Sequence, residues 1–72
     1  MPGNSSTASL GGRLKLAREA RHLTQAELAA RAGVQLDTLR AIEQGRTANP
    51  GVMIVLRLAD VLDTTVEHLV RG

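Results

Sequence analysis

The absence of cysteine constrains this chain most, because a domain of 72 residues can bury only a small hydrophobic core. Domains this short usually depend on disulfides, a bound metal, a partner or very regular helix packing. Disulfides and thiolate zinc sites are excluded, and His22 and His68 lie too far apart in the sequence to form a metal-ligand motif. The sequence therefore predicts no metal and no cofactor, and it leaves helix packing or dimerisation as the source of stability.

Charge and composition narrow the possible partners. The formal net charge is +2, and eight of the nine basic residues are arginines, whose planar side chains suit bidentate contacts with phosphate and guanine. No aromatic residue is present, which argues against modules that stack single-stranded bases on aromatic rings. Double-stranded DNA is the nucleic-acid partner that remains.

The sequence also lacks the signals of a membrane protein, a secreted protein or an enzyme. No apolar run is long enough to span a membrane, and the first ten residues lack the basic and apolar regions of a signal peptide. No thiol, metal cluster or nucleophile-plus-base spacing points to catalysis. We expect a non-enzymatic cytoplasmic protein without membrane contact. Residues 1–9 read as a disordered N-terminal tail, and residues 10–72 read as one domain.

The clearest local signal is a helix start at Thr24. Its hydroxyl can cap a helix that opens at Gln25, and Glu27 can reach back to the Thr24 amide, which makes a capping box. Leu23 and Leu28 stand where a hydrophobic staple is expected. This helix runs to about Ala32, because Gly33 is the residue type expected where a helix ends in a left-handed turn.

Four further helices follow from similar signals. One spans about Leu10 to Arg21, with Leu10, Leu14 and Ala17 as its apolar stripe. Another covers Leu36 to Gln44 and stops at Gly45. The fourth is predicted to open with Asn49 as cap and Pro50 at its first position, and to run to about Leu62. The fifth is predicted to open with a capping box of Thr64 and Glu67. The buried residues expected in the last two helices are Val52, Val55, Ala59, Leu62, Val66, Leu69 and Val70. No segment alternates as a strand would, so the predicted fold is all-α with five helices.

The central feature is the pair of short helices joined by a tight turn between Gln25 and Gln44. Their steep crossing requires small residues where the backbones approach, and Ala29 and Gly33 occupy those positions. Val34, Leu39 and Ile42 can close the angle as core residues. This is the helix-turn-helix pattern, in which the second helix enters the major groove of DNA.

From about Leu10 to Leu69 the chain resembles the phage repressor and Cro-like (XRE-type) helix-turn-helix family. The segments that carry the resemblance are Leu23-Thr24-Gln25-Ala26-Glu27-Leu28-Ala29, Ala32-Gly33-Val34, Leu39, Ile42-Glu43-Gln44-Gly45, Asn49-Pro50 and Leu58-Ala59-Asp60-Val61-Leu62. The resemblance implies a lambda-repressor-like fold of five helices, with the helix-turn-helix at helices 2 and 3, that reads operators as a homodimer.

The resemblance also implies roles for individual residues. The base contacts it implies are Gln35, Leu36, Asp37, Arg40 and Ala41. The phosphate contacts it implies are Thr24, Gln25, Gln44, Arg46, Thr47 and Asn49. Gln25 also places a backbone amide at a helix N-terminus, which favours an anion. A structural salt bridge is implied between Arg18 and Glu43.

Two features depart from the family's pattern. Leu36 and Asp37 stand where polar or basic residues are commoner, although leucine can contact a thymine methyl group and aspartate can accept from cytosine N4. The loop after the recognition helix carries only one basic residue, Arg46. We therefore expect modest affinity per monomer, with specificity that depends on Gln35, on Arg40 and on dimer geometry. The alternative for Arg40 is an exposed pair with Asp37, three residues earlier.

Three apolar residues on the fourth helix, Met53, Ile54 and Val61, occupy positions that the family usually fills with polar residues. They are either scattered surface residues, which are common, or a dimer interface. Leu16 on the first helix raises the same question. The functions that compete are a DNA-binding transcriptional regulator of repressor type, from a bacterial source by composition, and a protein-binding module such as an antitoxin or anti-repressor component.

Overall fold

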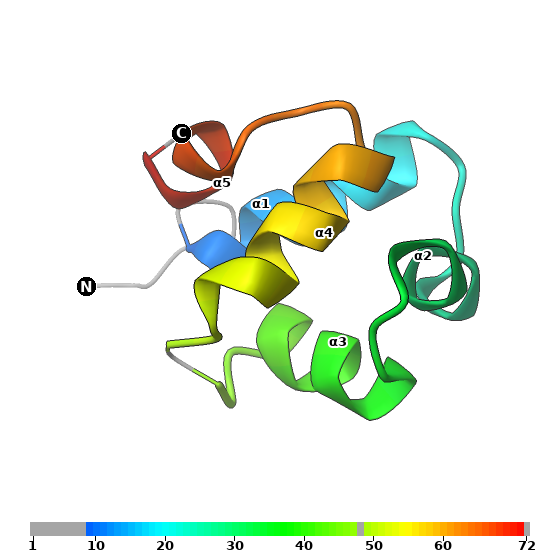
Figure 1. The fold of residues 1–72 in the computed structure, drawn as a ribbon, viewed down its shortest axis with the longest axis horizontal. Helices are drawn as coiled ribbons and strands as arrows, with labels where there is room; N and C mark the ends of the chain where they lie inside the picture. The colour runs from blue at the N-terminus through cyan, green and yellow to red at the C-terminus, as the bar shows by residue number, and fades with distance from the viewer. Residues whose placement is uncertain (1–8, 48, 72) are drawn as a thin grey trace.

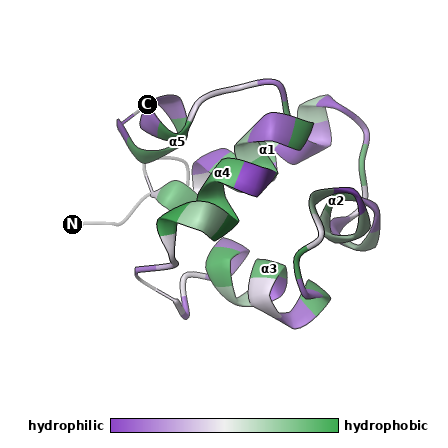
Figure 2. Cartoon of the chain, in the orientation of Figure 1, coloured by the Kyte–Doolittle hydropathy of each residue, from purple (hydrophilic) through white to green (hydrophobic). Residues whose placement is uncertain are grey.

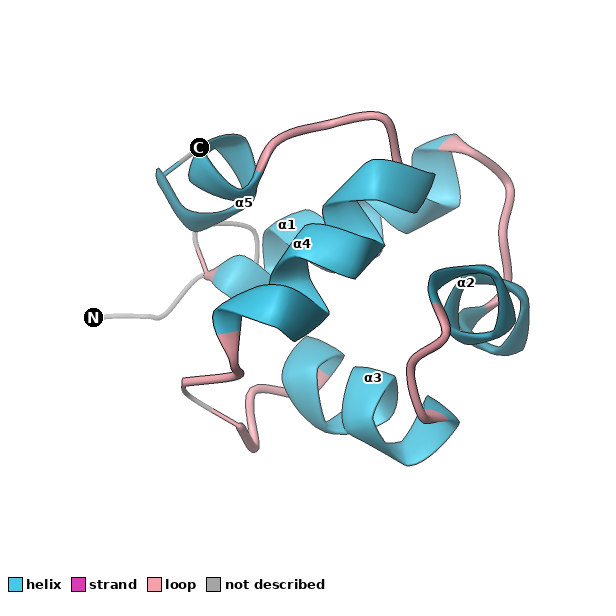
Figure 3. Ribbon diagram, in the orientation of Figure 1, coloured by secondary structure: helices cyan, strands magenta, loops and turns pink. Residues whose placement is uncertain are grey.

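The computed structural model describes residues 9–47 and 49–71, which form five α-helices and no strand (Figures 1 and 3). The helices are α1 (Leu10–Ala20), α2 (Gln25–Ala32), α3 (Leu36–Glu43), α4 (Val52–Val61) and α5 (Val66–Arg71). The prediction of an all-α fold with five helices is confirmed. Of the expected tail, residues 1–8 lie outside the described part of the chain. Ser9 is the N-cap of α1, because its hydroxyl accepts a hydrogen bond from the Gly12 amide at 3.0 Å.

The helices enclose one aliphatic core. Each helix packs against two others, in the cyclic order α1, α3, α2, α4, α5 and back to α1. Because the ring closes, the amphipathic face of each helix is buried by its two neighbours. The buried apolar residues are Leu14, Leu28, Ala29, Ala32, Val34, Leu39, Ile42, Val55, Leu58, Ala59, Leu62 and Leu69.

The start of α2 follows the sequence signal. Thr24 Oγ1 accepts from the Glu27 amide at 3.0 Å, and the Glu27 carboxylate accepts from the Thr24 amide at 2.8 Å. The pKa of Glu27 is held below its ordinary value, chiefly by its hydrogen bond with the Thr24 backbone amide. The hydrogen bond with the Thr24 side chain makes the second contribution. The predicted capping box is therefore confirmed, and it fixes the first residue of the helix-turn-helix.

Four helices end with the same motif, in which a residue of left-handed conformation follows the helix and two backward hydrogen bonds close it. Gly33 (φ 68°) and Gly45 (φ 76°) hold this position after α2 and α3, as the sequence predicts. His22 (φ 58°) and Asp63 (φ 56°) hold it after α1 and α4. Neither of these two positions is a glycine, so the sequence does not signal either helix end. The first helix was expected to end at Arg21, which is one residue too late. The expected ends at Gln44 and Leu62 are also one residue too late, because both are C-caps.

The predicted start of the fourth helix is wrong. Asn49 and Pro50 lie outside α4, whose N-cap is Gly51 in an extended conformation, with φ −60° and ψ 146°. Val52 is consequently the first helical residue, and its side chain is 66% exposed rather than buried. The buried stripe of α4 begins one turn later, at Val55, and includes Leu58, which lies between Val55 and Leu62.

The predicted cap of the fifth helix is also wrong. Thr65, not Thr64, caps α5, because Thr65 Oγ1 accepts from the His68 amide at 3.0 Å. The shift by one residue arises because Asp63 and Thr64 are already used to close α4, where the Thr64 amide donates to the Ala59 carbonyl at 3.0 Å. In α5 only Leu69 is fully buried, Val66 is half-buried and Val70 is exposed.

A buried ion pair joins α1 to α3. The Arg18 guanidinium donates to both carboxylate oxygens of Glu43, from Nε at 2.8 Å and from the second terminal nitrogen at 2.9 Å. The two side chains are only 10% and 2% exposed. Arg18 also donates to the Leu23 carbonyl at 2.8 Å, and Gln25 donates to Glu43 at 3.0 Å. The hydrogen bond to Glu43 raises the pKa of Arg18 despite its burial. This network ties α1, the start of α2 and the end of α3 together.

We expect Thr65→Ala to lower the free energy of unfolding by about 1 kcal/mol, because the substitution removes the α5 cap. Thr64→Ala is the matched control and should have a smaller effect, because Thr64 is outside the helix and does not cap it. Urea denaturation followed by circular dichroism measures both changes. A larger loss of unfolding free energy for Thr64→Ala than for Thr65→Ala would show that Thr64 is the cap of α5.

Breaking the ion pair should cost more than any cap. Glu43→Gln or Arg18→Met should destabilise the domain by about 3–5 kcal/mol, since each leaves a buried charge without its partner. The double variant Arg18→Met/Glu43→Leu should recover much of that loss, because no buried charge remains. Asp63→Asn, which breaks the exposed Arg21–Asp63 pair, should change the free energy by less than about 1 kcal/mol. Equal effects at the buried and the exposed pair in urea denaturation would contradict this expectation.

Candidate nucleic-acid interface

The turn between α2 and α3 is compact because small residues line it. Ala29 is buried where the two helices approach, and Gly33 supplies the left-handed conformation after α2. The Val34 amide donates to the Ala29 carbonyl at 2.9 Å, and the Val34 side chain is buried. The two helices are thereby fixed as a helix-turn-helix (Figure 1).

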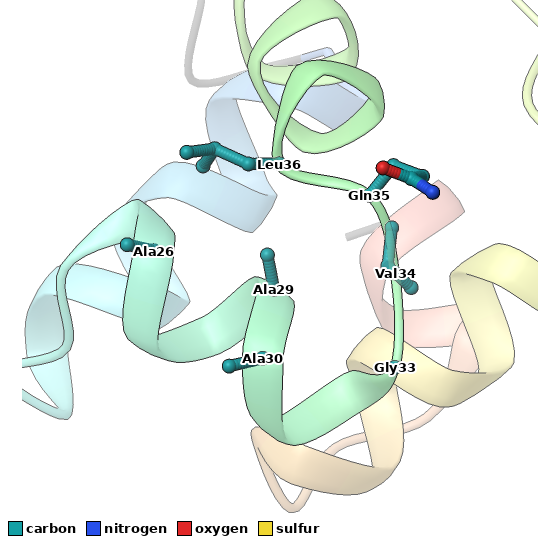
Figure 4. Close-up of a pocket in the computed structure, with 7 residues that line it drawn as sticks. All are labelled: Ala26, Ala29, Ala30, Gly33, Val34, Gln35 and Leu36. Atoms are coloured by element: carbon teal, nitrogen blue, oxygen red, sulfur yellow. The ribbon is translucent and has the colours of Figure 1, made fainter.

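A shallow cleft of about 380 Å³ opens between α2 and the segment that leads into α3 (Figure 4). Its lining is small and apolar apart from one amide side chain: Ala26, Ala29, Ala30, Gly33, Val34, Gln35 and Leu36. The cleft contains no ionisable side chain, so it offers no acid–base group. Its surface beside the first residues of α3 is mixed, part polar and part apolar.

The faces of α3 differ sharply. Leu39 and Ile42 point into the core and are almost fully buried. At 3.6 residues per turn, the opposite face carries Asp37, Arg40 and Gln44, all exposed, with half-buried Ala41 at its edge. The helix thus presents a polar surface outward while its inner face is locked.

Three of the five expected base-contact residues are exposed, at the N-cap of α3 or on its outward face: Gln35, Asp37 and Arg40. Gln35 is the exposed N-cap, and its side chain makes no capping hydrogen bond, which leaves the amide group available to a ligand. Asp37 and Arg40 form an exposed ion pair at 3.7 Å. Ala41 and Leu36 are half-buried, and Leu36 packs partly against the core beside the cleft.

The expected phosphate contacts are distributed over two segments. At the start of α2, the Thr24 hydroxyl is engaged in the capping box, and the Gln25 side chain is half-buried with its amide directed to Glu43. The helix N-terminus itself remains an anion-favouring feature there. The sequence did not predict the bond from Gln25 to Glu43, because the two residues lie 18 positions apart.

The second segment is the loop after α3. Arg46 Nε donates to Gln44 Oε1 at 2.9 Å, and both residues are exposed. The amides of Arg46 and Thr47 both donate to the Ala41 carbonyl, at 2.9 and 3.3 Å. Thr47 is half-buried and Asn49 is exposed. These bonds hold the backbone of Arg46 and Thr47 in a fixed position relative to α3.

The described part of the chain shows neither a metal site nor a membrane span. No group of three or more histidine, aspartate or glutamate side chains among residues 9–47 and 49–71 is placed to hold a metal ion. None of the helices in those ranges is long and apolar enough to cross a membrane.

Comparisons with known proteins agree with this geometry. Residues 9–71 match the family model described as a helix-turn-helix domain. The chain is 33% identical to SinR, the master regulator for biofilm formation, solved in complex with DNA, with a TM-score of 0.81 over 83% of this chain and 95% of that one. It is 31% identical to the N-terminal DNA-binding domain of SinR from Bacillus subtilis, with a TM-score of 0.83 over 90% and 91% of the two chains.

Other solved structures extend the likeness. The restriction-modification controller protein C.AhdI from Aeromonas hydrophila is 29% identical, with a TM-score of 0.80 over 92% of this chain and 98% of that one. The chain spans 58% of the matched chain in a complex of SinR with SinI. No curated protein sequence matches the chain. The family match over residues 9–71, together with the fold and the exposed second helix of the motif, places the chain in the helix-turn-helix family of the phage repressor and Cro (XRE) type.

Proposed function

We propose that this protein is a transcriptional regulator of repressor type that binds double-stranded DNA in a sequence-specific manner. The observation that carries the proposal is the outward polar face of α3, held rigid from behind by the core and by the Arg18–Glu43 pair. A helix of this kind fits the major groove, where base edges differ most. SinR and the P22 c2 repressor, both of which share the fold, were solved in complex with DNA. We expect this protein to act in the cytoplasm, because bacterial DNA is located there.

Gln35 and three residues of α3 offer four different chemistries for reading bases. Gln35 can bind adenine through its free amide, and Arg40 can bind guanine once it leaves Asp37. Asp37 can accept from cytosine N4. Leu36, beside the alanines of the cleft, can contact a thymine methyl group. The Asp37–Arg40 pair offsets charge on this face, which supports modest affinity for each subunit.

Phosphate binding is assigned to the two flanking segments. One segment precedes α3 in the sequence and is the N-terminus of α2 at Gln25. The other follows α3 and is the loop from Gln44 to Asn49. Arg46 is the basic residue of the loop and is exposed. Phosphate contacts fix register without reading sequence, so these segments orient α3 over the bases.

We also propose that the protein binds as a homodimer through α4, with a surface that differs from the expected one. Ile54 and Val61 are half-buried and pack against the core, at one edge of the buried stripe. The exposed apolar residues of α4 lie at the other edge and on its outer face: Val52, Met53 and Leu56. Figure 2 shows the first turns of α4 as hydrophobic. Leu16 is exposed as well, and it lines a groove between α1 and α5.

The competing function is a protein-binding module such as an antitoxin or anti-repressor component. The exposed apolar surface of α4 favours it, and SinR, which shares the fold, has been solved in a complex with the SinI protein. The two functions differ in what they require of α3, since only DNA binding needs its outward face. Selection of binding sites from a random pool of duplexes tests this directly, and a palindrome with half-sites about one helical turn apart is expected.

Two arginine variants should separate base reading from phosphate binding on the selected site. Arg40→Ala should cost about 1–3 kcal/mol and relax the preference at one base position. Arg46→Ala should weaken binding to all duplexes alike and reduce the slope of log affinity against log salt by about 1 per bound subunit. Arg71→Ala, which removes an exposed arginine from α5, is the matched control and should change neither quantity. No enrichment of any duplex by the folded protein would favour the protein-binding module.

The dimer proposal predicts that Met53→Glu weakens self-association without unfolding the domain, because Met53 is 57% exposed. Met53→Leu keeps the apolar surface and should preserve the monomer–dimer balance. Ile54→Glu should instead lower thermal stability, because that side chain packs against the core. Sedimentation equilibrium of the three variants measures the balance. An unchanged balance for Met53→Glu would place the interface elsewhere.

A further inference from the structure

Gly11, in the first turn of α1, lies where the backbones of α1 and α3 meet. It is buried, and a Cβ atom added to it would overlap the carbonyl oxygen of Ile42. The same atom would lie 3.1 Å from the Glu43 carbonyl oxygen and 3.2 Å from its Cα atom. All three atoms belong to the backbone of α3, so no change of side-chain rotamer can relieve the overlap. A side chain at position 11 therefore requires the start of α1 and the end of α3 to move relative to each other.

Gly11 lies on the face of α1 that packs against α3. Gly11, Leu14 and Arg18 are spaced by three and four residues and share one face of α1. Arg18 binds the Glu43 side chain, Leu14 packs in the core, and Gly11 admits the α3 backbone. The ion pair fixes the register of α1 against α3. The absence of a side chain at Gly11 sets how closely the two helices approach each other.

The contacted end of α3 adjoins the proposed DNA-binding surface. Arg40 and Ala41 lie within one turn of Ile42, and the loop amides of Arg46 and Thr47 bond to the Ala41 carbonyl. A shift at Ile42 therefore displaces both a base-contact residue and the phosphate loop. Binding constellations have to be held within roughly 0.5 Å of their productive geometry, so even a small displacement matters.

We propose that Gly11 is a positioning residue for sequence recognition: its lack of a side chain sets the depth and direction of α3. The consequence for DNA rests on the function proposed above, whereas the consequence for helix geometry does not. Alanine favours helical structure more than glycine does, which partly offsets the strain and helps Gly11→Ala to stay folded.

The test compares Gly11→Ala with the wild-type chain in two measurements. Residual dipolar couplings of the free protein report the orientation of α3 relative to α1, and a changed orientation is expected. Fluorescence anisotropy gives the ratio of affinities for the selected duplex and a scrambled duplex. We expect this ratio to fall by about tenfold or more, the effect of losing one base contact. If Gly11→Ala is partly unfolded, both measurements are made in trimethylamine N-oxide, which favours the folded state.

Two controls separate positioning from general destabilisation. Gly51→Ala makes the same chemical change where an added Cβ meets nothing within 4 Å, and it should alter neither measurement. Leu69→Val weakens the core in α5, away from α3, and should lower the melting temperature while the affinity ratio stays constant. Unchanged couplings in Gly11→Ala, or an affinity ratio equal to that of Leu69→Val, would overturn the inference. A wild-type chain without sequence preference would overturn the proposed function, while the couplings would still decide the role of Gly11 in helix geometry.

Discussion

The buried pair of Arg18 and Glu43 is the interaction on which the rest of the structure depends. Removing two charges from water is unfavourable, and it is offset only where the geometry is good and the remaining hydrogen-bonding groups find partners. Here the pairing is bidentate, the Leu23 carbonyl accepts a further guanidinium hydrogen bond, and Gln25 donates to the carboxylate. The cost of desolvation thus selects one arrangement of α1, α2 and α3. In a domain without disulfides, this selection gives the recognition helix a fixed orientation.

The outward face of α3 is chemically modest by comparison. Asp37 offsets the charge of Arg40, and the loop supplies Arg46 as its basic residue. Such a surface attracts DNA less strongly than a highly basic one, because phosphate contacts supply much of the affinity. Discrimination among sequences then depends more on the accuracy with which α3 is placed. Close backbone packing at Gly11 and the loop bonds to Ala41 are consistent with that requirement.

Helix α4 contributes apolar residues both to the core and to the exposed surface. Its buried stripe of Val55, Leu58, Ala59 and Leu62 completes the ring of helices, and the apolar residues at the two edges of this stripe differ in environment. Those at one edge pack against the core, whereas those at the other are exposed. Hydropathy alone cannot distinguish the two groups, because the side chains of both are apolar. The positions of α2 and α5 determine which apolar residues of α4 are buried and which remain exposed.

The sequence by itself determined the features that depend on local interactions. The capping box of Thr24 and Glu27, the glycine stops at Gly33 and Gly45, and the apolar spacing of five helices act within one or two turns of chain, so they can be recognised without a fold. The resemblance to a known family supplied the Arg18–Glu43 pair and the residues that we propose to contact DNA. The true caps of α4 and α5 were missed, because Gly51 has no side chain that would signal a cap and Thr64 is used to close α4. Tertiary structure alone decided the bond from Gln25 to Glu43, the partial burial of Leu36, Ile54 and Val61, and the contact at Gly11. Each of these depends on residues far apart in the chain, whose approach is set by packing and not by local sequence.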